Sequence, residues 1–232
     1  MGQTHVILWD WDNTLADTFG ALWGALNDVS HYYGLSPLSQ TEAKKAINQS
    51  GRNLIKKLVK PELVEEAHSY FWESYIRNID QLKAATAAED TLQYARSLGF
   101  INILASNKVK PILLNEANQL NLAPYFDRII GAGEAFEDKP SKTFTDKALE
   151  GFDAKGLIVS IGDGLSDVKM ARNYPNGLSI LVFTNPNGNE FENEKPDICA
   201  DNLTHCKSVL QTLAQQPNSL AVHRNSPKGK QR

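Results

Sequence analysis

Short apolar runs alternate in this chain with segments whose apolar residues recur at the spacing of an amphipathic helix. Most of the runs are apolar at nearly every position, which is typical of strands buried on both faces of a sheet. Strands that alternate with helices predict an α/β fold with a parallel sheet covered by helices. The expected strands are residues 5–9, 100–106, 128–132, 157–163 and 179–183, and the expected helices between them include residues 88–99, 110–120 and 166–174.

Residues 18–82 interrupt this alternation, because they show helical spacing throughout and contain no run that resembles a strand. Ser39 and Glu42 have the spacing of a capping box, and Pro61 is placed to open a third helix. We expect Thr18 to cap the first helix of the segment. Because the segment lies between the first two strands, it predicts a separate helical unit inserted into the sheet domain.

The expected organisation therefore has three parts. A core that contains the sheet comprises residues 1–17 and 83–216, the helical unit comprises residues 18–82, and residues 217–232 form a basic tail expected to be disordered. Residues 223–232 hold four of the 24 basic side chains and none of the 27 acidic ones, so the rest of the chain is acidic. An acidic body argues against a nucleic-acid partner.

No apolar stretch approaches the roughly 20 residues that a membrane-spanning helix needs, and the amino terminus lacks the pattern of a secretory signal. We therefore expect a cytoplasmic protein with no membrane partner. The two cysteines, Cys199 and Cys206, are too few for a disulfide framework, and the five histidines do not have the spacing of a metal site. Both cysteines are expected to be buried or idle thiols.

Polar side chains follow four of the predicted strands. In open parallel sheets, ligands bind beyond the carboxyl ends of the strands, so these side chains are expected to share one edge of the sheet. Each of them alone could belong to a turn or a helix cap. Together, four carboxylates, a hydroxyl and an ammonium suit a divalent cation bound beside a phosphate. They are Asp10 and Asp12 after the first strand, Ser106 and Asn107 after the second, Lys139 beyond the third, and Asp163 and Asp167 after the fourth.

The same residues form four motifs, in order along the chain, that resemble those of the haloacid dehalogenase superfamily. The motifs are "DWDNT", the serine of "ILASN", the lysine of "DKP", and "GDGLSD". The resemblance covers about residues 5–205 and is strongest to the phosphatase branch with a helical C1-type cap, in particular to phosphoglycolate phosphatase-like enzymes. It implies a Rossmann-like parallel sheet with helices on both faces, and a catalytic core with an inserted all-helical cap.

The resemblance also implies a role for each carboxylate. Asp10 would be the nucleophile that becomes an aspartyl phosphate, and Asp12 would be the general acid and base. Mg²⁺ would be held by a carboxylate oxygen of Asp10, the backbone carbonyl of Asp12 and Asp163, with Asp167 acting directly or through water. The side chain of Trp11, between the two aspartates, is expected to face away and pack against the core or the cap.

Phosphate binding is expected from residues of the second and third motifs. Ser106 would donate a hydrogen bond to a phosphoryl oxygen, and Lys139 would supply positive charge to the phosphate and to Asp10. Asn107 would contribute mainly its backbone N–H. In the cap, Arg52 stands where similar caps place a substrate-specificity loop, although a solvated helix start explains this arginine equally well.

The expected function is Mg²⁺-dependent hydrolysis of a small phosphorylated metabolite by a monomer or small homo-oligomer. Dehalogenases and phosphonate hydrolases of this superfamily lack the second acid of the first motif, whereas Asp12 is present here. Sugar-phosphate mutases keep both aspartates but carry a histidine near the start of the first cap helix. This chain reads "TFGALWGAL" there, without a histidine, which favours a phosphatase. A mutase and a non-catalytic phosphate-binding or partner-binding protein are the alternatives, and a receiver-like module is opposed by the cap and by Asp12.

Overall fold

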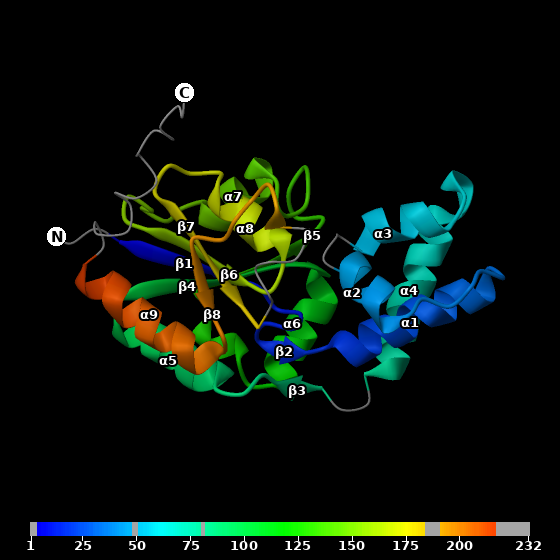
Figure 1. The fold of residues 1–232 in the computed structure, drawn as a ribbon, viewed down its shortest axis with the longest axis horizontal. Helices are drawn as coiled ribbons and strands as arrows, with labels where there is room; N and C mark the ends of the chain where they lie inside the picture. Colours follow the sequence, from blue (N-terminus) through cyan, green and yellow to red (C-terminus); the bar gives the residue numbers. More distant parts are fainter. Residues whose placement is uncertain (1–3, 48–50, 80–81, 184–190, 217–232) are drawn as a thin grey trace, which may run out of the picture.

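A parallel sheet forms the centre of the computed structural model, which describes residues 4–47, 51–79, 82–183 and 191–216 (Figure 1). The sheet has six strands in the order β5-β4-β1-β6-β7-β8, and every neighbouring pair is parallel. This arrangement confirms the α/β fold expected from the alternating pattern. The strands are β1 (His5–Trp9), β4 (Phe100–Val109), β5 (Arg128–Ala132), β6 (Ile158–Gly162), β7 (Gly177–Val182) and β8 (Ile198–Ala200).

The main departure from the expected strands is the length of β4. The sequence predicts that this strand ends at Ser106, but it continues to Val109, so Asn107 lies within it and does not follow it. The pairing register between β4 and β5 shifts between Ala105 and Val109. Such an irregularity redirects side chains locally. The short edge strand β8 was not predicted.

Alternation along β1 sends its side chains to the two faces of the sheet. Ile7 and Trp9 join one core cluster, with α5 (Ala88–Ser97), α6 (Lys110–Gln119) and α9 (Leu203–Gln215). Val6 and Leu8 join another, with α7 (Lys142–Leu149) and α8 (Leu165–Ala171). A short 3-10 turn, η2 (Ala123–Tyr125), follows α6. Helices therefore cover both faces of the sheet.

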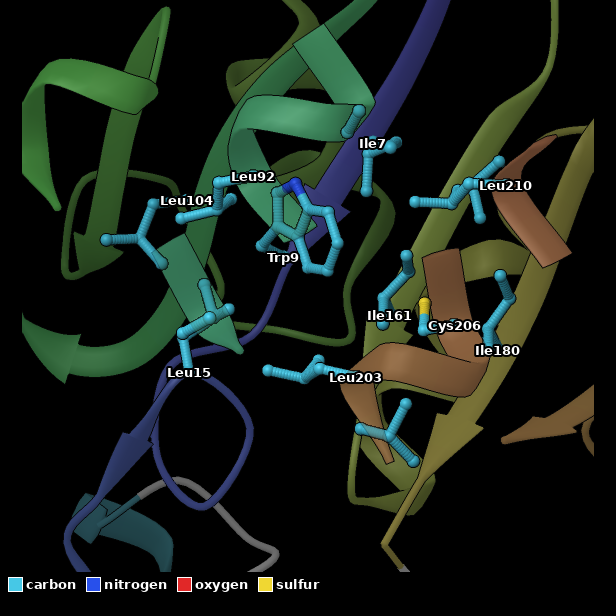
Figure 2. Packing of buried hydrophobic residues seen from close by; sticks show 14 of the residues in the cluster. Ile7, Trp9, Leu15, Leu92, Leu104, Ile161, Ile180, Leu203, Cys206 and Leu210 are labelled. Atoms are coloured by element: carbon cyan, nitrogen blue, oxygen red, sulfur yellow. The ribbon is translucent and has the colours of Figure 1, made fainter. Parts of the chain in front are cut away.

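Figure 2 shows the larger cluster from close by, with Trp9 of β1 pointing toward Leu92 of α5. Cys206 is buried in this cluster, whereas Cys199 is exposed, and both are free thiols. No helix among the described residues is long and apolar enough to cross a membrane.

The helices between β1 and β4 form a second packing unit, which we call the helical insertion. It comprises α1 (Phe19–Tyr32), α2 (Gln40–Ile47), α3 (Gly51–Leu58), the 3-10 turn η1 (Pro61–Leu63) and α4 (Val64–Asn78). Its apolar side chains form a cluster of their own, separate from the clusters on the sheet. At its base, β2 (Ala16–Asp17) and β3 (Lys83–Ala84) pair as an antiparallel ribbon. Figure 1 shows these helices beside the sheet and not on either of its faces.

Two local predictions for the insertion have different outcomes. The capping box is confirmed, because Ser39 N donates to Glu42 Oε2 over 2.8 Å and Glu42 N donates to Ser39 Oγ over 3.3 Å. Thr18 is the N-cap residue of α1, as expected, but its side chain makes no capping hydrogen bond. Its hydroxyl donates instead to Asp12 Oδ1 over 2.6 Å, so Thr18 connects the insertion to the first motif. The helix expected from Pro61 begins as η1 and becomes α-helical at Val64.

Candidate active site

Asp10 is the first residue beyond β1, and its carboxylate is held from two sides. Its Oδ1 accepts a hydrogen bond from Lys139 Nζ over 2.7 Å, and its Oδ2 accepts one from Thr14 Oγ1 over 3.1 Å. Its backbone N–H donates to Ile161 O of β6 over 2.8 Å, which ties the residue to the neighbouring strand. The side chain is almost completely buried, so its orientation is fixed by these contacts.

The tight turn after Asp10 brings Thr14 back to this carboxylate. The carbonyl of Trp11 accepts hydrogen bonds from the backbone N–H groups of Thr14, Leu15 and Ala16 over 3.0 to 3.2 Å. Asn13 takes the left-handed conformation, with φ of 60°, which asparagine tolerates better than most residues. The sequence "WDNTLA" therefore folds into a loop that supplies a hydroxyl donor to Asp10.

Lys139 is the positive charge of the site. Its buried ammonium lies 2.7 Å from Asp10 Oδ1 and 2.5 Å from Asp167 Oδ1. Burial alone would lower the pKa of Lys139, but the carboxylates of Asp10 and Asp167 outweigh burial and raise that pKa above its usual value. Asn107 Nδ2 donates to the carbonyl oxygen of Lys139 over 3.1 Å, so this side chain holds the loop that carries the lysine.

Asp163 and Asp167 bring two more carboxylates to the site from the end of β6 and the first turn of α8. Gly162 separates Asp163 from the strand interior, and a Cβ at Gly162 would collide with the Asp167 carboxylate. Asp167 Oδ2 accepts from the backbone N–H of Gly164 over 3.1 Å, which fixes it at the start of the helix. The small residues of "GDGLSD" thus make room for an inward carboxylate.

The three carboxylates of Asp10, Asp163 and Asp167 fit a hard divalent cation. Each offers one oxygen, and these oxygens all lie within 4.8 Å of one another. Burial and mutual repulsion raise the pKa of Asp10 to about 7, against the opposing effect of Lys139, and raise the pKa of Asp163 well above its usual value. Crowded buried carboxylates with raised pKa values are what a cation would stabilise, and the all-oxygen donor set suits Mg²⁺.

Asp12 faces a different set of partners from Asp10. Its Oδ1 lies 2.7 Å from the ammonium of Lys108 and accepts the 2.6 Å hydrogen bond from Thr18. Its Oδ2 accepts no hydrogen bond from the described residues, and 20% of the side chain is exposed. One oxygen of Asp12 is therefore held, while the other is open to a ligand.

Lys108 belongs to a buried network that the sequence analysis missed. Its other partners are Glu116 of α6, at 2.7 Å from Oε2, and Tyr75 of α4, at 2.8 Å from the hydroxyl. Burial raises the pKa of Glu116, and it raises the pKa of Tyr75 together with the nearby charges of Asp12 and Glu116. The position of Lys108 two residues after Ser106 was the available signal, but nothing in the sequence marks Glu116 or Tyr75 as its partners.

The remaining expected site residues lie in different surroundings. Ser106 is buried on β4, and its Oγ accepts from the backbone N–H of Lys108 over 3.1 Å. Trp11 is fully buried in the core, as expected from its position between the aspartates, and its indole Nε1 donates to Glu116 Oε2 over 2.6 Å. Arg52 belongs to α3, but its side chain lies outside the described part of the structure, as do residues 217–232.

Comparison with known proteins identifies the family of this chain. The haloacid dehalogenase-like hydrolase family model matches residues 7–176. A phosphoglycolate phosphatase of Aquifex aeolicus is 31% identical over 171 residues, which cover 72% of this chain and 80% of that protein. The chain therefore belongs to the haloacid dehalogenase-like hydrolases. This result confirms the resemblance inferred from the four motifs and the expectation that the chain is an enzyme of the phosphatase type.

Solved structures show the same fold. CbbY of Rhodobacter sphaeroides, in complex with phosphate, superposes with a TM-score of 0.71 at 20% identity, covering 87% of this chain and 95% of that chain. A haloacid dehalogenase-like family hydrolase of Streptococcus pneumoniae superposes with a TM-score of 0.77 at 18% identity, covering 91% of this chain and 100% of that chain. The Rossmann-like architecture expected from the resemblance is thereby confirmed.

Proposed function

We propose that this protein is a Mg²⁺-dependent phosphatase that hydrolyses a small phosphate monoester through an aspartyl phosphate on Asp10. The observation that carries the proposal is the ammonium of Lys139, placed 2.7 Å from Asp10 and 2.5 Å from Asp167. A carboxylate nucleophile and a phosphate dianion repel each other, so the attack needs positive charge at this position. The third carboxylate, Asp163, completes the oxygen cluster beside it.

In the first displacement, a carboxylate oxygen of Asp10 attacks phosphorus, and the bond from phosphorus to the ester oxygen breaks. Asp12 gives its proton to the departing alkoxide. In the second displacement, Asp12 takes a proton from water as the water oxygen attacks the aspartyl phosphate. Inorganic phosphate leaves, and Asp10 is restored. The contacts of Asp10 with Lys139 and Thr14 hold the nucleophile in one orientation through both steps.

The phosphoryl group would be bound by the Ser106 hydroxyl, the Lys139 ammonium and the backbone N–H of Asn107. The carboxylates of Asp10, Asp163 and Asp167 and the backbone carbonyl of Asp12 would hold Mg²⁺. When bound, Mg²⁺ favours the ionised form of Asp10 and neutralises charge on the phosphoryl oxygens. That support matters here because the pKa of Asp10 is raised to about 7 without a cation.

Phosphoglycolate is the first substrate to test, because curated relatives that match most of this chain carry the name phosphoglycolate phosphatase. Arg52 would contact the carboxylate or other group that distinguishes one substrate from another. Sugar phosphates and nucleoside monophosphates belong in the same panel, since substrate choice in a shared fold depends on the residues that surround the leaving group.

The test measures phosphate release from this panel in Mg²⁺ and in EDTA, with Asp10→Asn as the inactive variant. Asp153→Asn is the matched control, because this aspartate is exposed and pairs with Lys155. We expect Mg²⁺-dependent release by the wild type and the control, and none by Asp10→Asn. No release from any ester by folded wild-type protein would overturn the phosphatase proposal, and conversion of a sugar phosphate to its isomer would favour the mutase.

A second measurement addresses the intermediate. Substrate labelled with ³²P is mixed with enzyme and quenched in acid, in which acyl phosphates survive. The label is expected on the wild-type protein, to be released by alkali, and to be absent from Asp10→Asn. Turnover without labelled protein in rapid-quench samples would contradict the covalent route through Asp10.

A further inference from the structure

Lys108 is a fully buried lysine in the strand that carries Ser106. Its ammonium has three N–H donors, and the structure gives it three oxygen partners. These are Asp12 Oδ1 at 2.7 Å, Glu116 Oε2 at 2.7 Å and the Tyr75 hydroxyl at 2.8 Å. The donors and acceptors match in number, so the ammonium is held in a single orientation.

Glu116 is held as firmly as the lysine. Its Oε2 accepts from Trp11 Nε1 over 2.6 Å as well as from Lys108, and its Oε1 accepts from the Tyr75 hydroxyl over 2.7 Å. The network joins the turn after β1, the end of β4, helix α6 and helix α4 of the insertion. Asp12 is the member of this network that takes part in the proposed proton transfers.

A buried ion pair is a weak source of stability, because the free energy needed to remove both charges from water is about as large as the free energy gained from their attraction. A network of this kind therefore suggests a function in orientation. Lys108 and Thr18 both bind Oδ1 of Asp12, which leaves Oδ2 as the oxygen available for proton transfer. A rotation of the carboxylate would break the contact with Lys108.

We propose that Lys108 is a positioning residue that orients the Asp12 carboxylate for proton transfer, and that Glu116 and Tyr75 hold Lys108 in place. The inference rests on the proposed role of Asp12 as general acid and base. Because Lys108 is fully buried, it acts through Asp12 and not by contact with the substrate.

The dependence of the rate on the leaving group of the ester tests this role. Expulsion of an alkoxide, as from phosphoglycolate, needs a proton from Asp12, whereas p-nitrophenolate is stable enough to leave almost without one. Loss of a well-placed general acid costs roughly 10²-fold or more on the alkyl ester. Hydrolysis of the aspartyl phosphate, in which Asp12 is the base, is common to both esters and enters kcat, whereas kcat/KM reports the first displacement alone. A misplaced Asp12 should therefore lower kcat/KM for phosphoglycolate much more than kcat/KM for p-nitrophenyl phosphate.

The variants are chosen so that the protein still folds. Lys108→Met leaves the carboxylates of Asp12 and the buried Glu116 without their cation, so Lys108→Met/Glu116→Gln is made beside it to remove the buried charge. Tyr75→Phe removes only a hydroxyl. Lys110→Met is the matched lysine control, since Lys110 pairs with Glu134 at 3.0 Å, and Tyr70→Phe is the control for Tyr75 on the same helix.

For the Lys108→Met/Glu116→Gln variant we expect kcat/KM for phosphoglycolate to fall about 30-fold and kcat/KM for p-nitrophenyl phosphate to fall less than about 3-fold. Tyr75→Phe should show the same preference with a smaller loss, and the two controls should match the wild type. Equal losses of kcat/KM on both esters, or a raised KM with unchanged kcat, would overturn the positioning role.

Asp12→Asn separates this inference from the proposed function. If wild-type protein hydrolyses neither ester, the phosphatase proposal fails and the positioning role fails with it. If the wild type is active but Asp12→Asn lowers kcat/KM equally for both esters, Asp12 is not the acid of the first displacement and Lys108 has no proton donor to position. If Asp12→Asn shows the leaving-group preference and the Lys108 variants do not, the inference alone is wrong.

Discussion

The indole Nε1 of Trp11 donates a 2.6 Å hydrogen bond to Oε2 of Glu116, so the residue between the two aspartates is anchored in the core. Because Trp11 lies between Asp10 and Asp12 in the chain, anchoring its side chain helps to fix the backbone that carries both carboxylates. The tryptophan thus connects the first motif to the buried network around Lys108.

Replacing this tryptophan should cost more than an ordinary core substitution. Trp11→Phe removes a hydrogen bond to a carboxylate that is paired with Lys108, and we expect the free energy of unfolding to fall by about 2 kcal/mol or more. Trp9→Phe is the matched control, because Trp9 is equally buried and donates to the neutral Asn102 Oδ1 over 3.0 Å. Urea unfolding measures both; a smaller loss for Trp11→Phe than for Trp9→Phe would contradict the importance of the charged acceptor.

Gly162 is required by the position of Asp167. An alanine Cβ at Gly162 would collide with the Asp167 carboxylate, which would have to leave Lys139. Gly162→Ala should therefore lower kcat by roughly 10-fold or more, since a displacement of about 1 Å in a catalytic site can cost 10²-fold. Gly20→Ala is the control, because a Cβ at this exposed helical position meets nothing within 4 Å and should leave activity unchanged. Steady-state kinetics with circular dichroism of both variants tests the prediction.

Five of the six sheet strands could be predicted, because buried parallel strands are continuous apolar runs. The runs at residues 5–9 and 128–132 match β1 and β5 without a shift. The end of β4 could not be predicted, because the residues after Ser106 are polar and so resemble the end of a strand. They are polar because they belong to the candidate site, and the strand continues through them. Helices α7 and α9 were missed, although Ser141 and Asn202 cap them with side chains that accept from backbone N–H groups.

The candidate site was predictable where chemistry and local spacing coincide. Asp10 and Asp163 follow the neighbouring strands β1 and β6, and Asp167 lies in the first turn of α8, the helix after β6, so the topology brings the three carboxylates together. The network of Glu116 and Tyr75 was not predictable, since its hydrogen bond joins α6 to α4 across 41 positions of the chain. A single buried lysine two residues after a motif does not reveal such partners.

The crowded carboxylates make stability depend on pH in the absence of a cation. The folded protein holds the pKa of Asp10 at about 7, whereas an aspartate in the unfolded chain has a pKa of about 3.9. Between these values the folded state binds more protons than the unfolded state, so stability falls as pH rises. We expect wild-type protein in EDTA to lose stability relative to Asp10→Asn between pH 5 and pH 7, the window of about two units inside that shift.

Urea unfolding of both proteins at pH 5, 6 and 7 (roughly unit steps) gives the comparison, because their difference removes the contributions of groups that do not interact with Asp10. Added Mg²⁺ should reduce the loss in the wild type and have a weaker effect on Asp10→Asn. A difference that stays constant across this range in EDTA would show that Asp10 is not held against repulsion in the folded state.

Asp163→Asn should separate metal binding from folding. The amide keeps the shape of the side chain but removes one of the three carboxylates whose oxygens lie within 4.8 Å of one another. Because Mg²⁺ prefers charged oxygen ligands, the Mg²⁺ concentration for half-maximal rate should rise about 10-fold or more. The increase in melting temperature on adding Mg²⁺ should shrink in parallel, since ligand binding to the folded state produces that increase. Asp153→Asn should retain both responses, and an unchanged Mg²⁺ titration of Asp163→Asn by rate and by melting temperature would remove Asp163 from the ligand set.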